Sequence, residues 1–205
     1  ASMSGAAQML ATGALSTEKA ERMASLVEKQ SRRVSELIEG YLSLSRNSAE
    51  FPPARLDLNE VVNDTIEGAM HGFAGGVSIV FNRAEDEPVI NGNRVRIGQV
   101  LTNLLRNSVE AIKNTKQPTI TVETQVSSSD NRVSVKVSDN GPGIPQGFGH
   151  RMWEPFETTR DDGTGLGLYI VRRIVEEHGG TIEASGSAAG GAVFTAVFPG
   201  AGVQS

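Results

Sequence analysis

The sequence predicts an α+β protein in which a helical hairpin precedes a domain that mixes helices and strands. Residues 18–48 contain no proline, and their apolar side chains recur at alternating steps of four and three residues, as in a coiled-coil seam. Beyond residue 57, segments with helical periodicity are interspersed with segments whose apolar residues alternate, as they do in strands. Between these parts, Pro52 and Pro53 are expected to break any helix. We therefore expect two structural units that meet near residue 50.

Composition excludes several classes of protein. The chain has 205 residues, of which 38% are hydrophobic, so it can build a packed core and is not intrinsically disordered. Its formal charge is −5 and its basic residues are scattered, which gives no footprint for nucleic acid or for an anionic membrane surface. Without cysteine there is neither a disulfide framework nor a thiolate metal site. Because there is no signal peptide or long apolar run either, we expect a soluble chain, whole or cut from a larger protein.

The N-terminal unit, residues 1–50, is expected to dimerise. Its seam consists of Met23, Val27, Gln30, Val34, Leu37, Tyr41 and Leu44. The same steps recur over a shorter stretch beside Gly13, at Met3, Ala7, Leu10 and Ala14. Two helices joined near residues 13–17 form a hairpin, which hides its seam by pairing with a second copy. We therefore predict a homodimeric four-helix bundle through residues 1–48; the alternative is a hairpin that packs on the rest of its own chain.

The second unit is expected to span residues 57–200, after a linker at 51–56 and before a tail at 201–205. Asp57 and Glu60 predict a capping box at the start of a helix. The buried face of that helix is expected to be Leu58, Val61, Val62, Thr65, Ile66 and Ala69. Further helices are expected at about 93–113 and 164–178, and strands at 77–81, 120–126, 133–137, 181–185 and 192–198. A glycine-rich stretch, residues 140–163, interrupts this regular structure.

The helix at 93–113 carries polar side chains that its packing does not require. Its apolar stripe consists of Ile97, Val100, Leu101, Leu104, Leu105, Ala111 and Ile112. Asn103, Asn107 and Glu110 lie together on the flank of that stripe. A carboxamide offers an oxygen acceptor and two N–H donors, so two stacked asparagines suit a phosphate chain with its hydrated Mg²⁺. The alternative is a solvated helix flank.

Two glycine-rich motifs favour the phosphate interpretation. In "SDNGPGI", Asp139 ends an alternating strand and can accept a hydrogen bond from an exocyclic amine such as that of adenine. Gly141 and Gly143 then allow a ligand to approach the backbone closely. The motif "GTGLGL", residues 163–168, opens a helix whose free N–H groups and positive dipole end can receive phosphate. Neither motif is the dinucleotide fingerprint, and the sequence contains no P-loop.

Together these motifs resemble the ATP-binding domain of sensor histidine kinases, within the wider family that includes DNA gyrase, Hsp90 and MutL. The resemblance covers about residues 55–199. "NLLRNSVEA" is similar to the N box, in its nitrogen-regulation and pilus-type version, "DNGPGI" to the G1 box, "MWEPFETT" to the F box and "GTGLGLYIVRRIVEEHGG" to the G2 box. The resemblance implies a two-layer α/β sandwich, the Bergerat ATP-binding fold. The hairpin at 1–48 likewise resembles the dimerisation and phosphotransfer domain of these kinases.

The resemblance also assigns roles to single residues. Asn107 would coordinate Mg²⁺, Asp139 would bind the adenine amine, and Phe156 would anchor a lid at 144–163 that is hinged at Gly147 and Gly149. The implied ATP-binding residues are Asn103, Asn107, Asp139, Gly141, Gly143, Ile144, Arg160, Gly163, Thr164, Gly165, Leu166, Gly167 and Leu168.

Two positions depart from the family pattern. Arg160, where the family often has lysine, would contact the terminal phosphate with a flat guanidinium in place of an ammonium group. Val193 stands where the family often has a threonine near the base, which argues against a water-mediated contact to adenine through this side chain.

Asn103 distinguishes phosphotransfer from hydrolysis. The gyrase, Hsp90 and MutL branch uses a glutamate one turn before the metal asparagine as general base, and the resemblance places Asn103 at that position. An amide cannot take a proton from water, so ATP hydrolysis is expected to be slow. The implied function is transfer of the γ-phosphoryl group of ATP to a histidine, and then to an aspartate in the receiver domain of a response regulator.

The phosphoacceptor histidine is expected upstream of this chain. None of its three histidines, His71, His150 and His178, is followed by the acidic residue and proline of the family's phosphoacceptor motif, and His178 is expected to interact with a helix dipole. We therefore expect the cytoplasmic part of a kinase that begins just after that motif, with or without a membrane-anchored parent, and that binds Mg-ATP without phosphorylating itself. The alternative is a natural protein that has lost the motif.

Other functions remain as alternatives. One is a hydrolytic ATP clamp of the MutL or Hsp90 type, and another is a non-catalytic dimeric docking module for a response regulator. An anti-sigma serine kinase is a closer relative, but the seam at 23–44 favours the histidine-kinase bundle.

Overall fold

The computed structural model describes residue 8 and residues 16–45, 53–70, 76–160, 163–187 and 190–201. Its helices are α2 (Thr17–Ser45), α3 (Leu58–Met70), α4 (Arg94–Ala111), α5 (Gly167–Glu177) and the short 3₁₀ helix η2 (Arg151–Trp153). Its strands are β1 (Ala54–Asp57), β2 (Ser78–Asn82), β3 (Val89–Gly92), β4 (Thr119–Ser127), β5 (Arg132–Asp139), β6 (Thr181–Gly186) and β7 (Ala192–Pro199).

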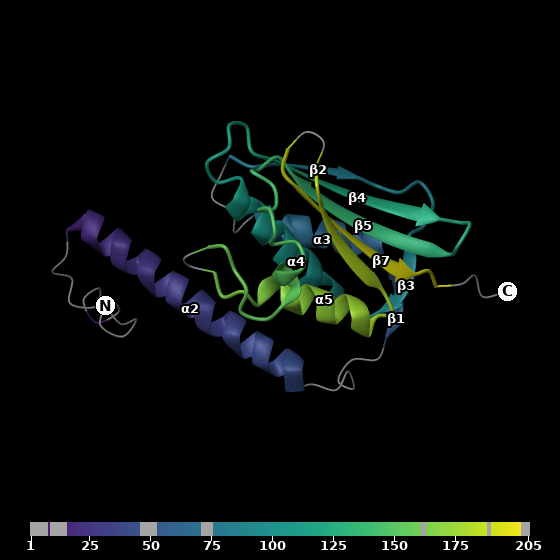
Figure 1. Ribbon diagram of the computed structural model, residues 1–205, viewed down its shortest axis with the longest axis horizontal. Coiled ribbons are helices and arrows are strands. Elements are labelled where there is room, and N and C mark those ends of the chain that lie inside the picture. Colours follow the sequence, from purple (N-terminus) through teal and green to yellow (C-terminus); the bar gives the residue numbers. More distant parts are fainter. Residues whose placement is uncertain are drawn as a thin grey trace.

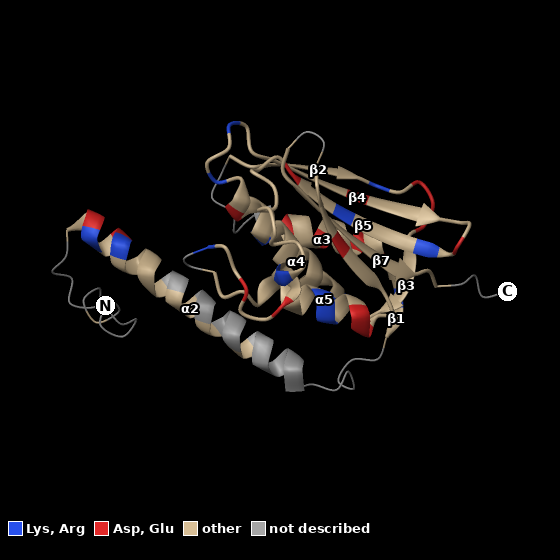
Figure 2. Cartoon of the chain, in the orientation of Figure 1, with Lys and Arg blue, Asp and Glu red and all other residues tan. Residues whose placement is uncertain are grey.

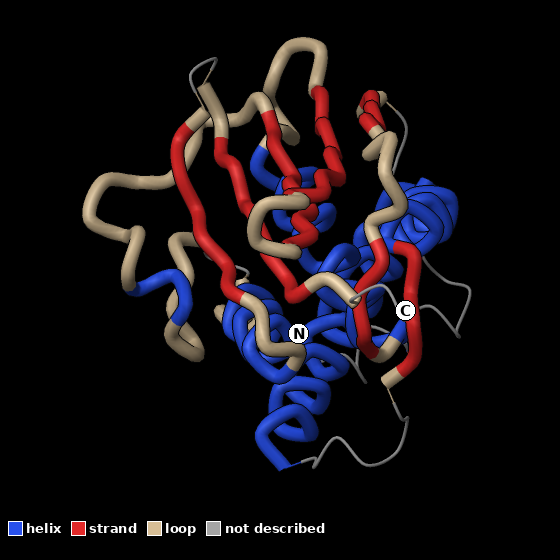
Figure 3. Tube along the Cα trace, turned by 90° about the vertical axis from the view of Figure 1, so that its right-hand side faces the viewer, coloured by secondary structure: helices blue, strands red, loops and turns tan. Residues whose placement is uncertain are grey.

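A five-stranded sheet in the order β2-β4-β5-β7-β6 forms one layer of the domain. Helices α3, α4 and α5 form the second layer and cover one face of this sheet (Figure 1, Figure 3). β2 and β4 are parallel, whereas the other neighbouring strands are antiparallel. The predicted fold, a sheet packed against helices in two layers, is therefore confirmed.

The core lies between these layers, where the sequence pattern predicts it. Val133, Val135 and Val137 of β5 are at most 2% exposed, and Leu104 and Leu105 of α4 at most 1%. Complete burial of an aliphatic side chain of this size contributes roughly 1.5–3 kcal/mol. Packing on the sheet therefore fixes the rotation of α4, and with it the direction in which its polar flank faces.

A second, two-stranded sheet is a feature that the sequence analysis missed. β1 and β3 pair antiparallel, with Leu56 opposite Ile90. β1 begins at Ala54, so the first strand of the domain lies partly within the range expected for the linker at 51–56. A β-bridge between Ile90 and Gly200 ties β3 to the end of the domain.

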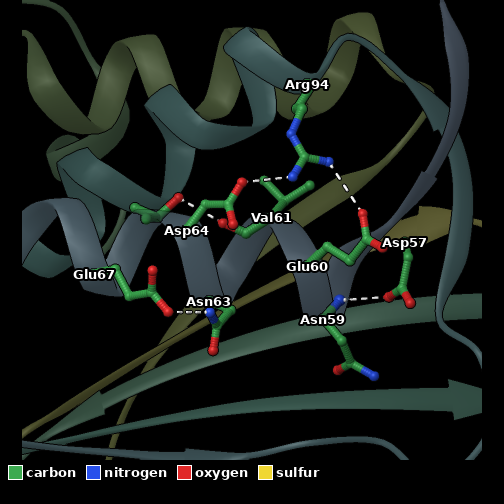
Figure 4. A network of polar contacts seen from close by, with 9 residues as sticks. Asp57, Asn59, Glu60, Val61, Asn63, Asp64, Glu67 and Arg94 are labelled. Carbon is green, nitrogen blue, oxygen red and sulfur yellow. Dashed lines mark hydrogen bonds and ion pairs between the residues drawn. The ribbon is translucent and has the colours of Figure 1, made fainter.

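Charged side chains connect α3 to α4 (Figure 4). Asp57 accepts a hydrogen bond from the Asn59 N–H at 2.7 Å and so caps α3, but Glu60 binds Arg94 of α4 at 3.5 Å and does not close the predicted capping box. Arg94 also donates to Asp64 at 2.6 Å, and this hydrogen bond raises the pKa of the guanidinium. Such partly exposed ion pairs contribute up to about 1 kcal/mol each. Elsewhere basic and acidic residues are interspersed along the described helices, strands and loops (Figure 2).

His178 joins the end of α5 to the start of α4. Its Nε2 accepts a hydrogen bond from the Asn93 N–H at 3.1 Å, so Nδ1 carries the proton and donates to Ile174 O at 2.7 Å. The ring also meets Phe198 edge-on, with 6.4 Å between the ring centroids. His178 therefore contacts the last turn of α5 through Nδ1 and the residue that caps α4 through Nε2.

Helix α2 covers the second part of the predicted hairpin and contacts α5. Val34 of the predicted seam is 46% exposed. The first helix of the hairpin, at residues 3–14, lies outside the described residues apart from residue 8, so the hairpin and the four-helix bundle stay predictions. His71 also lies outside the described residues. No helix in the described part of the chain is long and apolar enough to cross a bilayer.

Candidate functional site

The two asparagines of α4 lie beneath the first residue of α5. A Cβ atom on Gly167 would lie 3.7 Å from Asn103 Oδ1 and 3.9 Å from both polar atoms of the Asn107 amide. Asn103 is only 4% exposed, and its Oδ1 accepts a hydrogen bond from the Arg106 guanidinium at 2.7 Å. This places Asn103 at the base of the site, and not on an open flank.

Asn107 lines a pocket and keeps its hydrogen-bonding capacity. Within the described residues its carboxamide has no hydrogen-bond partner, and Arg160 lines the same pocket. Arg160 forms an ion pair with Glu110, one turn after Asn107 on α4. The predicted phosphate-binding arginine therefore lies beside the predicted metal-binding asparagine, paired with a carboxylate of the same helix.

Asp139 lies at the end of β5 and is 6% exposed. Its Oδ1 accepts hydrogen bonds from the Gly141 N–H at 2.9 Å and from the Ala192 N–H at 3.2 Å. A Cβ on Gly141 would lie 2.9 Å from that same oxygen, and Gly143 has a φ of +82°, so both glycines of the predicted turn are required by its geometry. Backbone donors therefore hold the carboxylate at the pocket.

The glycine-rich turn before α5 forms another part of the pocket wall. Gly163, Thr164 and Gly165 line the pocket together with Gly167, the first residue of α5. The helix begins three residues later than predicted from Thr164. Its N-terminal N–H groups lack partners within the helix, and with the positive end of the dipole they form a surface that favours an anion.

The segment predicted to form a lid, here called the lid, is described at residues 144–160 and 163. Phe156 is 66% exposed, so its ring does not anchor the lid; only its N–H is engaged, donating to Gly165 O at 3.0 Å. Met152 is buried, at 3% exposed, and Trp153 is half-buried against the core and meets Phe194 edge-on at 6.3 Å between centroids. Met152 and Trp153 lie in η2, whereas the Phe156 backbone has a φ of +67°. With this backbone conformation the Phe156 ring lies in solvent.

Most of the predicted site residues thus converge on one pocket. Those that line it are Asn107, Asp139, Gly143, Ile144, Arg160, Gly163, Thr164, Gly165, Gly167 and Leu168. Three others do not: Asn103 lies below Gly167, Gly141 supports Asp139, and Leu166 is 3% exposed in the core. Of the predicted hinges, Gly147 has a φ of +80° and Gly149 an ordinary one.

Several residues of the pocket were missed from the sequence. They include Arg106, Pro145, Phe148, Thr158, Ala192 and Phe194. Only Arg106 carried a usable signal, because it directly precedes Asn107 and is basic. Ala192 acts through its backbone N–H, which no sequence motif marks.

Ser108, beside Asn107, is a buried residue whose replacement should stabilise the domain. It is 1% exposed, and among the described residues its Oγ has no hydrogen-bond partner. Ser108→Ala removes this unsatisfied polar atom, so we expect the free energy of unfolding to rise by about 1 kcal/mol. Urea unfolding should show a higher midpoint with an unchanged slope. Thr124→Val is the matched control: the Thr124 hydroxyl bonds to Asn59 and Ala84, so this variant should be less stable. A Ser108→Ala variant less stable than wild type would contradict the assignment.

Comparison with known proteins identifies the family. A family model described as histidine kinase-, DNA gyrase B- and HSP90-like ATPase matches residues 92–202, more than half of the chain. The chain is 33% identical over 204 residues to the sensor histidine kinase ZraS of Klebsiella oxytoca, a match that covers 99% of this chain and 43% of ZraS. It is 33% identical over 172 residues to the C4-dicarboxylate transport sensor protein DctB of Rhizobium meliloti, covering 83% of this chain and 27% of DctB. The chain thus spans less than half the length of these relatives.

Solved structures agree with the sequence relatives. The catalytic domain of the histidine kinase ThkA superposes with a TM-score of 0.62 at 30% identity, over 73% of this chain and 96% of that domain. ThkA in complex with the response regulator protein TrrA gives a TM-score of 0.72 at 25% identity, over 96% of this chain and 56% of that one. The chain therefore belongs to the histidine kinase-, DNA gyrase B- and HSP90-like ATPase family, and its ATPase domain is of the histidine-kinase type.

Proposed function

We propose that the pocket binds Mg-ATP, with adenine against Asp139 and the phosphates between α4 and the first turn of α5. One observation carries this proposal: a buried carboxylate held by backbone donors and an asparagine with no protein partner among the described residues line the same pocket. The carboxylate is an acceptor for the adenine amine. The start of α5 favours the negative charge of the phosphates.

The donor set fits a magnesium ion that phosphate and water largely surround. No group of three or more His, Cys, Asp and Glu side chains in the described part of the chain is arranged to hold a metal. Mg²⁺ bound with a nucleotide needs only one or two protein oxygens, because phosphates and waters complete its octahedron. Asn107 Oδ1 would be that oxygen, since Asn107 lines the pocket, whereas Asn103 is 4% exposed and does not line it. The ion would neutralise charge on the phosphates.

For the whole protein, we propose transfer of the γ-phosphoryl group of ATP to a histidine and onward to an aspartate of a response regulator. Asn103 supports phosphotransfer over hydrolysis, because an amide at this position cannot accept a proton from water and its oxygen is already bonded to Arg106. Residues 1–48 would form the homodimeric bundle, and the kinase would work in the cytoplasm. The complex of ThkA with the response regulator protein TrrA is a precedent for the proposed partner.

Asn107→Ala tests this proposal. We expect isothermal titration calorimetry to detect ATP binding to the wild-type chain with Mg²⁺ and weaker binding after EDTA is added. The variant should bind Mg-ATP about 10- to 100-fold more weakly, because a contact to a charged partner contributes roughly 1.5–3 kcal/mol. It should also lose most of the dependence on Mg²⁺. Asn63→Ala is the matched control, because Asn63 donates to Glu67 on α3, outside the pocket lining.

Two results would contradict parts of this proposal. Equal affinity of the wild type and the Asn107→Ala variant would remove Asn107 from the metal site. Steady ATP turnover at the roughly 1–1,000 per second typical of enzymes would favour the hydrolytic clamp. In that case the asparagine at position 103 would not prevent ATP hydrolysis as proposed.

A further inference from the structure

Asp139 is supported by a segment far along the chain as well as by its own turn. Ala192, 53 residues later, donates its N–H to Asp139 Oδ1 at 3.2 Å. The ladder between β5 and β7 ends one pair earlier, at Ser138 opposite Val193. At this position the first residue of β7 therefore bonds to the side chain of Asp139.

Only glycine allows the chain to pass Asp139 this closely. A Cβ on Gly191 would lie 1.9 Å from the Asp139 carbonyl oxygen and 3.0 Å from Oδ1. Gly190 and Gly191 have backbone φ angles of +87° and +91°, which residues other than glycine rarely adopt. The turn is closed by hydrogen bonds from Gly190 N–H to Ser187 O at 3.1 Å and from Ser187 N–H to Gly191 O at 3.0 Å. The close approach is therefore built into the turn.

This support leaves one carboxylate oxygen for a ligand. Both backbone N–H groups bind Oδ1, so the carboxylate cannot rotate without losing two hydrogen bonds. Oδ2 has no hydrogen bond within the described residues, and Asp139 lines the pocket. An acceptor in a fixed position is complementary to an amine on a purine ring. A carbonyl group at the same ring position would place its acceptor oxygen against this acceptor oxygen, and no hydrogen bond could form.

We propose that Gly190, Gly191 and Ala192, here called the glycine support, are positioning residues that make the site selective for a 6-aminopurine. This inference rests on the proposed binding of Mg-ATP. Without the support, Asp139 would keep its charge but lose its orientation. The selectivity for 6-aminopurines over 6-oxopurines would then fall more than the affinity for nucleoside triphosphates as a class. The reason is that the proposed phosphate contacts come from α4 and α5, not from Asp139.

Gly191→Ala tests the glycine support with two nucleotides. Affinities for Mg-ATP and for Mg-ITP, which carries a 6-oxo group, are measured by calorimetry for the 205-residue chain. We expect the wild type to prefer ATP by at least about tenfold, because the rejected nucleotide leaves a buried acceptor unpaired. In the variant the ratio of the two affinities should fall at least about fivefold, mainly through loss of ATP binding. Gly186→Ala is the matched control, since nothing lies within 4 Å of its added Cβ and its φ is ordinary.

A second variant keeps the test decisive if Gly191→Ala does not fold. Ala192→Pro deletes the N–H that donates to Asp139 at the first residue of β7, where a strand tolerates proline. This variant should also lower the ratio of the affinity for Mg-ATP to the affinity for Mg-ITP. A folded variant of either kind that keeps the wild-type ratio overturns the glycine support. A wild-type chain that binds ATP and ITP equally would overturn it too, while leaving Mg-ATP binding intact. A wild-type chain that binds neither nucleotide would instead refute the proposed function itself.

Discussion

Asp139→Asn is expected to weaken Mg-ATP binding by about 10- to 100-fold and to reverse the preference between ATP and ITP. A carboxylate can accept hydrogen bonds on both oxygens, whereas the amide group has one acceptor oxygen and one donor NH₂ group. If its oxygen faces the N–H groups of Gly141 and Ala192, its NH₂ group faces the adenine amine, donor to donor. The same NH₂ group can donate to the 6-oxo group of ITP. Loss of ATP affinity with a gain for ITP is therefore the expected signature.

Calorimetric titration of both nucleotides measures this reversal. Asp130→Asn is the matched control, because Asp130 is exposed in the turn between β4 and β5 and accepts from Ser127, outside the pocket lining. Its affinities for both nucleotides should equal those of the wild type. Equal weakening for ATP and ITP in the Asp139→Asn variant would point to general damage to the fold. Unchanged binding of both would place the base away from Asp139.

Gly165→Ala should have the second large effect, because it breaks the connection between the lid and the glycine-rich turn. Gly165 has a φ of +67°, and an added Cβ would lie 2.4 Å from the carbonyl carbon of Phe156. The obstacle is backbone, so a side-chain rotation cannot relieve it, and the hydrogen bond from Phe156 N–H to Gly165 O must break. We expect a loss of about 1–3 kcal/mol in the free energy of unfolding and at least about tenfold weaker Mg-ATP binding.

Gly149→Ala provides the comparison for this variant within the same lid. Nothing lies within 4 Å of a Cβ at Gly149, and its φ is ordinary, so stability and affinity should stay at the wild-type level. Urea unfolding and calorimetry measure both quantities, and limited trypsin digestion at Arg151 and Arg160 reports on the lid. Faster cleavage is expected only for Gly165→Ala. Equal behaviour of the two variants would mean that the backbone contact does not hold the lid.

Long periodic segments made the layers of this fold predictable. The apolar stripe of α4 and the alternation in β4 and β5 each repeat several times, so one misplaced residue does not hide the period. The asparagines and Asp139 were found because they interrupt such patterns at fixed places. β1 and β3 were missed because each has only four residues, too few for alternation to stand out.

Contacts between distant segments account for the remaining differences. The support of Asp139 by Ala192 and the pairing of Arg160 with Glu110 join residues that no local motif relates. The expectation for Phe156 was wrong because an aromatic residue in a motif suggests burial, whereas a backbone with positive φ turned this ring outward. The local sequence gives the residue types at a site. The tertiary contacts of each residue depend on which distant segments of the chain pack against it.

Trp153 has a practical consequence for spectroscopy. It is the single tryptophan of the chain, it lies in η2, and its ring lies edge-on to Phe194 in the pocket wall. Light at the long-wavelength edge of indole absorption therefore excites one side chain, beside the pocket proposed to bind a nucleotide. Tryptophan fluorescence can therefore follow the proposed binding of a nucleotide in stopped flow without an attached dye.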